Sequence, residues 1–76
     1  MEYKRITQIE KPRLLELFDK YEGYSKQDIT IHEMLELFSY LITSGDINYL
    51  QGFYQRECEN LILCKYLSRE GYILYK

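Results

Sequence analysis

The stretch TIHEMLELFSYLITSGDINYLQGFYQRECENLILCKYLSR, residues 30–69, decides the fold. It begins with an amphipathic helix that closes in a tight turn at residues 43–45. A short segment over 46–51 follows, Gly52 interrupts the chain, and a last long helix is expected over about 53–69. The segments on either side are shorter and less regular, so we expect them to pack around this central unit.

The first helix of this stretch has a clear beginning and end. Thr30 and Glu33 have the spacing of a capping box, in which the hydroxyl and the carboxylate each bond a free backbone N–H of the first turn. Apolar residues then recur at helical spacing along one face. They are Ile31, Met34, Leu35, Leu37, Phe38, Leu41 and Ile42. His32, Glu33, Glu36, Ser39 and Thr43 are expected on the other side. Gly45 is expected to end the helix, and Asp46 to cap the next turn.

The last helix has a different pattern, because residues 61–64 (LILC) are all apolar. A helix that is apolar in every direction is normally covered on more than one side. The cover could come from the N-terminal arm and the C-terminal tail, or from a second copy of the chain in a homodimer. Gly71 is expected to end this helix. Residues 72–76 then form an extended tail, which could pair as a strand with the N-terminal arm.

The N-terminal part is expected to contain an arm, a helix and a loop. Residues 1–10 fit a helical turn or a short strand equally well. Pro12 suits the first turn of a helix, where its missing N–H costs nothing, and Gly23 is expected to end that helix. Residues 24–29 then form a connecting loop. The apolar face of the helix would consist of Leu14, Leu15, Leu17, Phe18 and Tyr21.

These patterns predict an all-α fold, a small compact bundle of three main helices plus one short helix with an extended C-terminal tail. The 76 residues are expected to form a single helical domain over 1–76. A domain this small buries only ~60% of its unfolded surface. Its 46% of hydrophobic residues offsets that shortage. No apolar run approaches the ~18 residues that cross a membrane, so no membrane partner is expected.

The charge distribution argues against nucleic acid as the partner. The net charge is −2, and between residues 27 and 64 Arg56 is the only lysine or arginine. The acids of that segment are Asp28, Glu33, Glu36, Asp46, Glu57 and Glu59. Phosphates would be repelled from such a unit. The alternative is a helix-turn-helix-like regulator, suggested by the spacing around 43–45, whose last helix would enter the major groove and present Arg56, Lys65 and Arg69.

No set of residues predicts catalysis, a cofactor or a metal site. His32 is the only histidine. Its i, i+4 spacing to Glu36 allows at most a weak surface metal contact, and a solvated histidine is the simpler interpretation. Cys58 and Cys64 would lie about 9 Å apart along a helix, on different sides of it, which is beyond disulfide reach. Two buried thiols without a signal peptide fit a reducing compartment.

Tyrosine is strongly over-represented, with nine in 76 residues. Tyr21, Tyr66 and Tyr40 fit the core or its edge, whereas Tyr49, Tyr54, Tyr72 and Tyr75 are harder to place inside. Tyrosine covers a large area at low entropic cost and keeps a polar tip, so it is favoured at protein interfaces. Small proteins also use it to shield a thin core, and both interpretations remain open.

The segment Leu50-Gln51-Gly52-Phe53-Tyr54-Gln55-Arg56 resembles a family of very short, uncharacterised proteins of tailed bacteriophages. These proteins share a Leu-Gln-Gly-x-Tyr-x-Arg core. In them a Leu-Phe-x-x-Leu-Ile-x-[Ser/Thr]-Gly segment precedes the core, as in residues 37–45 here. A helix ending in Gly-[Tyr/Leu]-Ile follows, as in 71–73. The family has a second glycine in the core where this chain has Gln55.

The resemblance implies a viral protein, and it carries over Gln51, Gly52, Tyr54 and Arg56 as motif positions. Combined with the small size, the tyrosines and the absent chemistry, it predicts a non-enzymatic protein of the host cytoplasm. Such a protein would bind a host protein of transcription, replication or defence and inhibit or redirect it. The predicted partner-binding residues are Tyr49, Gln51, Tyr54, Arg56, Glu33 and Glu36. Gln51 and Arg56 could instead only satisfy backbone groups at the break between two helices.

Overall fold

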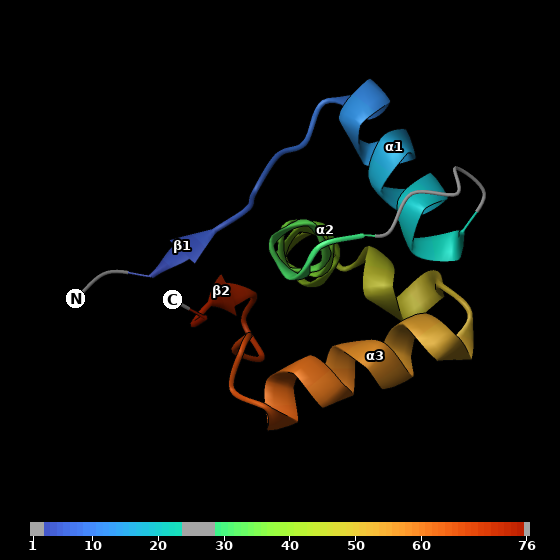
Figure 1. The fold of residues 1–76 in the computed structure, drawn as a ribbon. Coiled ribbons are helices and arrows are strands. Elements are labelled where there is room, and N and C mark those ends of the chain that lie inside the picture. Colours follow the sequence, from blue (N-terminus) through green and yellow to red (C-terminus); the bar gives the residue numbers. More distant parts are fainter. Residues whose placement is uncertain (1–2, 24–28, 76) are drawn as a thin grey trace.

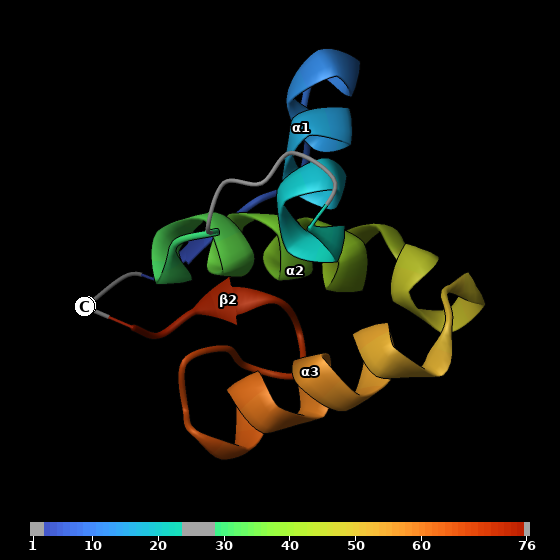
Figure 2. The same cartoon turned by 45° about the vertical axis from the view of Figure 1, so that its right-hand side comes forward.

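Helix α2 (Ile31–Ser44) forms the centre of the molecule in the computed structural model, which describes residues 3–23 and 29–75. Helix α1 (Lys11–Glu22) packs on one side of α2, and helix α3 (Gly52–Leu63) crosses it on the opposite side (Figure 1). Figure 2 shows α1 rising from α2 at a steep angle. The predicted loop over 24–29 falls almost entirely on residues 24–28, which lie outside the described residues.

Three main helices and one short 3₁₀-helix, η1 (Asp46–Tyr49), confirm the mainly helical prediction. The all-α description needs one correction, because the chain also contains two short strands, β1 (Lys4–Arg5) and β2 (Tyr72–Ile73). They pair antiparallel, with Lys4 opposite Ile73. Of the helical turn and the strand that fitted residues 1–10, the arm therefore contains the strand. The tail pairs with it, as was also considered.

Helices α1 and α2 begin and end where their local signals predict. Pro12 lies in the first turn of α1, and Gly23 ends that helix in the left-handed conformation at φ 84°. Thr30 and Glu33 form both hydrogen bonds of the capping box, and Gly45 ends α2 at φ 85°. The prediction of the apolar face of α1 is confirmed in part, because Leu17 is fully buried, whereas Leu15 is exposed.

The central helix α2 supplies more of the core than any other described element. Its fully buried residues are Leu35, Leu37, Phe38, Ser39 and Leu41. The prediction that Ser39 faces the polar side was wrong, because the two chain ends cover that side of α2. The Ser39 hydroxyl accepts the Ile6 N–H at 2.8 Å and donates to the Gly71 carbonyl at 2.6 Å. One buried hydroxyl therefore joins the arm, the central helix and the C-terminal turn.

The last helix is shorter than predicted, since it ends at Leu63 and not near residue 69. Lys65 then adopts a left-handed backbone at φ 64°, and the chain turns back on itself. This turn brings Leu67 into the core, where it forms a bridge with Ile73. Burial of a leucine is worth ~1.5–3 kcal/mol, which offsets the ~1–2 kcal/mol cost of a left-handed residue.

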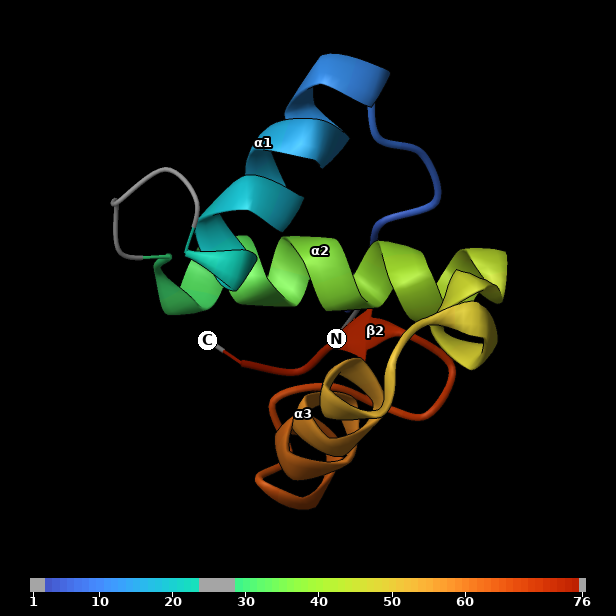
Figure 3. The same ribbon diagram turned by 90° about the vertical axis from the view of Figure 1, so that its right-hand side faces the viewer.

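Gly71 has a different role from the helix stop that was predicted. It lies at φ 99° in the tight turn before β2, pressed against α2. The C-terminal segment thus covers one side of α3 and of α2, as Figure 3 shows. Cover on all sides is not achieved, because the Leu63 side chain remains 73% exposed. Among the residues that the structure describes, no helix is long and apolar enough to cross a membrane.

Candidate functional site

Among the residues that the structure describes, the most exposed aromatic side chain lies at the junction of η1 and α3. Tyr49 is 88% exposed. The chain then runs extended through Leu50 and Gln51, and α3 begins at Gly52. Phe53 and Arg56 follow on the exposed side of the first turns of α3. We name the exposed side chains Tyr49, Gln51, Phe53 and Arg56 the 49–56 edge.

Gln55 holds this edge in place. Its amide Nε2 donates to the carbonyl oxygens of Ile47 and Leu50, each at 3.4 Å, and so connects η1 to α3. The alternative interpretation gave this backbone role to Gln51 and Arg56. In the described structure, neither of those two side chains bonds a backbone group, and both point to solvent. Gln55 occupies the position where the resembling phage family has glycine, which explains why the motif did not reveal it.

Tyr54 does not belong to the exposed surface, which differs from its prediction as a partner-binding residue. Only 3% of it is exposed, because its position on α3 turns the ring toward α1 and α2. The ring packs against Tyr21, Phe53 and Phe18 at centroid distances of 5.1, 4.5 and 5.8 Å. Its hydroxyl donates to the Glu22 carboxylate. Tyr54 is therefore a core tyrosine whose polar tip reaches the last turn of α1.

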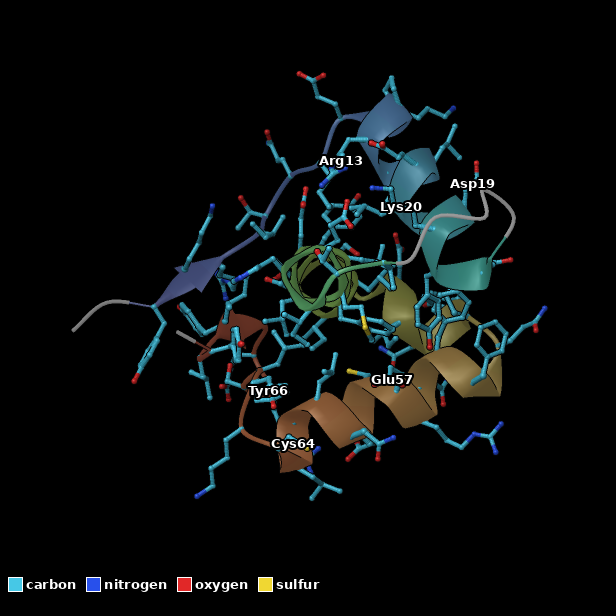
Figure 4. The ribbon with its side chains drawn as sticks, viewed as in Figure 1. Arg13, Asp19, Lys20, Glu57, Cys64 and Tyr66 are labelled. Atoms are coloured by element: carbon cyan, nitrogen blue, oxygen red, sulfur yellow. The ribbon has the colours of Figure 1, made fainter. Side chains whose placement is uncertain are left out.

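Glu33 and Glu36, the other two predicted partner-binding residues, face α1 and not the 49–56 edge. Arg13 donates from Nε and Nη2 to the two Glu36 oxygens at 3.3 and 3.0 Å. Lys20 Nζ lies 2.6 Å from Glu33 Oε2. Arg13 and Lys20 both extend from α1 toward α2 (Figure 4). The acidic face that was predicted to meet a partner is thus largely neutralised inside the molecule.

This ion-pair cluster predicts acid-sensitive stability. The hydrogen bond from Lys20 and then the one from the Thr30 N–H lower the pKa of Glu33 from 4.5 to about 2. Because the folded-state pKa is the lower one, the stabilisation is complete above about pH 4.5 and is lost as the pH falls toward 2. Urea unfolding at pH 6 and pH 3 should show a smaller pH-dependent loss for Glu33→Gln than for the wild type.

Glu70→Gln is the matched control for this measurement. Glu70 is exposed and makes no ion pair within the described residues, so its substitution should leave the pH-dependent loss at the wild-type value. If Glu33→Gln and Glu70→Gln lose stability equally between the two pH values, the ion pair does not contribute as stated.

Several hollows lie around the 49–56 edge. The first, of about 390 Å³, lies between the end of α2, η1 and α3. Its apolar lining consists of Ile42, Ile47, Cys58 and Ile62, and the ion pair between Glu59 and Arg69 lies at its rim. The second lies between the end of α1 and the start of α3 and is lined by Tyr21, Glu22, Gln51 and Phe53. A third hollow is lined by Gly52, Gln55, Arg56, Glu59 and Asn60, so recesses surround the edge.

The two cysteines and the histidine, the residue types most often found in catalytic or metal sites, have ordinary structural surroundings. Cys58 and Cys64 are both free thiols, as their spacing predicts, but only Cys58 is buried. Burial raises the pKa of Cys58 to about 11, which keeps it protonated. Cys64 lies exposed at the end of α3 (Figure 4). His32 packs edge-on against Tyr75 at 5.6 Å, while Glu36 bonds Arg13 instead.

Within the described part of the chain, no group of three histidine, cysteine, aspartate or glutamate side chains could hold a metal ion. The geometry around the 49–56 edge offers instead an exposed aromatic ring, an amide, a guanidinium and adjoining recesses. Such a combination of rigid aromatic and polar groups is suited to contact with another macromolecule.

Comparison with known proteins places the chain in a family. The model of the family described as a domain of unknown function, DUF7417, matches residues 11–76, so the chain belongs to this family. The match includes all three helices and the C-terminal turn. Neither the curated proteins nor the solved structures gave a match.

Proposed function

We propose that this member of the DUF7417 family is a non-enzymatic bacteriophage protein that binds a host protein. Binding would inhibit or redirect a component of transcription, replication or defence in the host cytoplasm. The observation that carries the proposal is the 88% exposed ring of Tyr49, presented by a short 3₁₀-helix. A tyrosine that shields no core has its whole surface available to a partner.

The neighbours of Tyr49 support a protein partner. Phe53 is partly exposed beside it, and Gln51 and Arg56 add an amide and a guanidinium. Tyrosine and arginine are the residue types that contribute most to binding energy at protein interfaces. Gln55 holds the connection between η1 and α3, so the edge needs little ordering on binding, and this favours affinity.

The charges on α3 argue against the nucleic-acid alternative. If α3 were a recognition helix, its charged side chains Arg56, Glu57 and Glu59 would face the phosphates and the groove. Lys65 and Arg69 lie beyond its end at Leu63, and Arg69 contacts Glu59 at 3.4 Å. A surface with more carboxylates than free bases is repelled by phosphate.

Removal of the edge should abolish partner capture without unfolding the protein. We expect the double variant Tyr49→Ala/Arg56→Ala to retain less than about a tenth of the captured partner, because loss of such residues typically costs at least ~2 kcal/mol. Both side chains are exposed, so the unfolding free energy should change by less than ~0.5 kcal/mol. The measurement is affinity capture from the bacterial host with quantitative mass spectrometry.

Tyr3→Ala provides the matched control, since Tyr3 is an exposed tyrosine on the N-terminal arm. It should capture the partner like the wild type. The proposal fails if the wild type captures no protein in stoichiometric amount, or if the double variant and Tyr3→Ala capture it equally. A mobility shift with random duplex DNA at low salt, weakened by Arg56→Ala, would favour the alternative function.

A further inference from the structure

We infer that the hollow between the end of α1 and the start of α3 binds an arginine side chain of the partner protein. The inference rests on the proposed function, since it concerns how a protein partner is recognised. The hollow adjoins the 49–56 edge and shares Gln51 and Phe53 with it. A segment lying on the edge could therefore insert one side chain here.

Two of the four residues that line the hollow, Tyr21 and Phe53, are aromatic. The rings of Tyr21 and Phe53 lie nearly parallel, with an interplanar angle of 15° and centroids 6.0 Å apart. Phe53 is 37% exposed, so part of its side chain is accessible to a ligand. A planar guanidinium stacks on aromatic rings and is attracted by the negative potential of their faces.

The hollow also carries negative charge that the described residues do not neutralise. Glu22 lies at its rim, and the hydroxyl of the buried Tyr54 bonds its carboxylate. Neither Glu22 nor Glu57 forms an ion pair with a lysine or arginine in residues 3–23 and 29–75. Burial, and then the charge of Glu57, raises the pKa of Tyr21, so the negative potential reaches the aromatic wall.

The end of α1 adds to this potential. The helix macrodipole places partial negative charge at the C-terminus, beside Glu22 and Gly23. Most other acids that face α1 are paired, as Glu33 and Glu36 are with Lys20 and Arg13. Glu22 is different, because its hydrogen-bond partner Tyr54 is neutral and leaves the carboxylate charge in place.

These features select arginine over other occupants. A phosphate or carboxylate would be repelled by Glu22 and Glu57. An apolar side chain would desolvate the charged Glu22 carboxylate and the Gln51 amide without offering either group a hydrogen bond. A guanidinium stacks on Phe53, donates to Glu22 in a charge-assisted hydrogen bond and can donate again to the Gln51 carbonyl oxygen. Lysine offers the charge without the planar stacking surface.

The test is an NMR titration of the full chain with the peptide acetyl-Gly-Gly-Arg-Gly-Gly-amide, following the ring resonances of Tyr21 and Phe53. We expect saturable shifts with a dissociation constant on the order of 1 mM, as suits a single side chain. The peptide with citrulline in place of arginine has the same shape without charge and should bind about tenfold more weakly. The lysine peptide should fall between the two.

Glu22→Gln keeps an acceptor for Tyr54 and removes the charge, so it should weaken arginine-peptide binding about fivefold or more. Glu70→Gln changes the net charge equally, away from the hollow, and should leave binding unchanged. The inference is overturned if citrulline shifts the rings as strongly as arginine, or if the two variants behave alike. Full partner capture by Glu22→Gln would reject the arginine site while the proposed function stands.

Discussion

Gly71→Ala should lower the unfolding free energy by roughly 2–5 kcal/mol. Two costs add at this position. The backbone lies at φ 99°, where a residue with a side chain is strained by ~1–2 kcal/mol. A Cβ would also lie 2.7 Å from Thr43 Oγ1 and 3.1 Å from the Ser39 carbonyl oxygen, and such overpacking costs ~1–3 kcal/mol. Domains have only ~0.05–0.15 kcal/mol of stability per residue, so urea unfolding should show a large loss.

Gly23→Ala separates the two costs. Gly23 has a similar left-handed backbone at φ 84°, yet a Cβ there would meet nothing within 4 Å. Its substitution should cost only the ~1–2 kcal/mol of backbone strain. Adding Thr43→Ala to Gly71→Ala should restore part of the loss, because the shortest contact disappears. Equal losses for Gly71→Ala and Gly23→Ala would show that the close approach to α2 is unimportant.

The contrast between these glycines shows what a sequence reveals. Gly23 and Gly45 end helices, and their roles follow from neighbours a few residues away. The same holds for Pro12 and for the capping box of Thr30 and Glu33. Their helices could be predicted with nearly correct boundaries because capping is a local interaction. Gly71 was also predicted as a helix stop, but its conformation is set by α2, more than 25 residues away in the chain.

The end of α3 could not be predicted for the same reason. Nothing near Leu63 stops a helix, and the residue that turns left-handed is Lys65, not a glycine. The decisive gain is the burial of Leu67 against the strand at Ile73. Ile73 belongs to β2, which also pairs with the arm at Lys4. A helical pattern continuing through 64–69 was therefore overridden by tertiary packing.

The candidate site divides in the same way. Tyr49, Gln51 and Arg56 lie in one short segment and are exposed as predicted, whereas Tyr54 of the same segment is buried. Glu33 and Glu36 could not be placed correctly, because their partners Arg13 and Lys20 come from another helix. Residues that line the hollow between α1 and α3, such as Glu22 and Phe53, have no sequence signal. Only the packing of α1 against α3 brings them together.

The folded molecule places tyrosines both in its core and at its surface. Tyr54 fills the core and places a hydroxyl under Glu22, whereas Tyr49 shields nothing. The buried ring organises the hollow, and the exposed ring forms the adjoining ridge. One short segment, residues 49–54, thus contributes one tyrosine to the core and one to the surface.

Ser39→Ala should cost roughly 2–4 kcal/mol, although it removes a single oxygen atom. The hydroxyl bonds the Ile6 N–H and the Gly71 carbonyl, and the alanine leaves both groups without this partner. Each buried polar group that loses its partner costs ~1–3 kcal/mol. The loss of stability should be greatest in the N-terminal arm, since the hydroxyl bonds Ile6, the residue directly after β1, to α2. Urea unfolding gives the global cost, and amide hydrogen exchange at Ile6 reports the local one.

Ser44→Ala is the control, because Ser44 lies in the same helix but is exposed. Its hydroxyl donates to the Leu41 carbonyl at 3.4 Å and accepts the Asp46 N–H at 3.2 Å, contacts that water can replace. It should cost less than ~1 kcal/mol and leave exchange at Ile6 unchanged. In Ser39→Ala the Ile6 amide should exchange at least tenfold faster, since a ~1.4 kcal/mol loss of local stability corresponds to that factor. Unchanged exchange at Ile6 would mean that the arm is held by the two-stranded sheet alone, and the joint role of Ser39 would have to be abandoned.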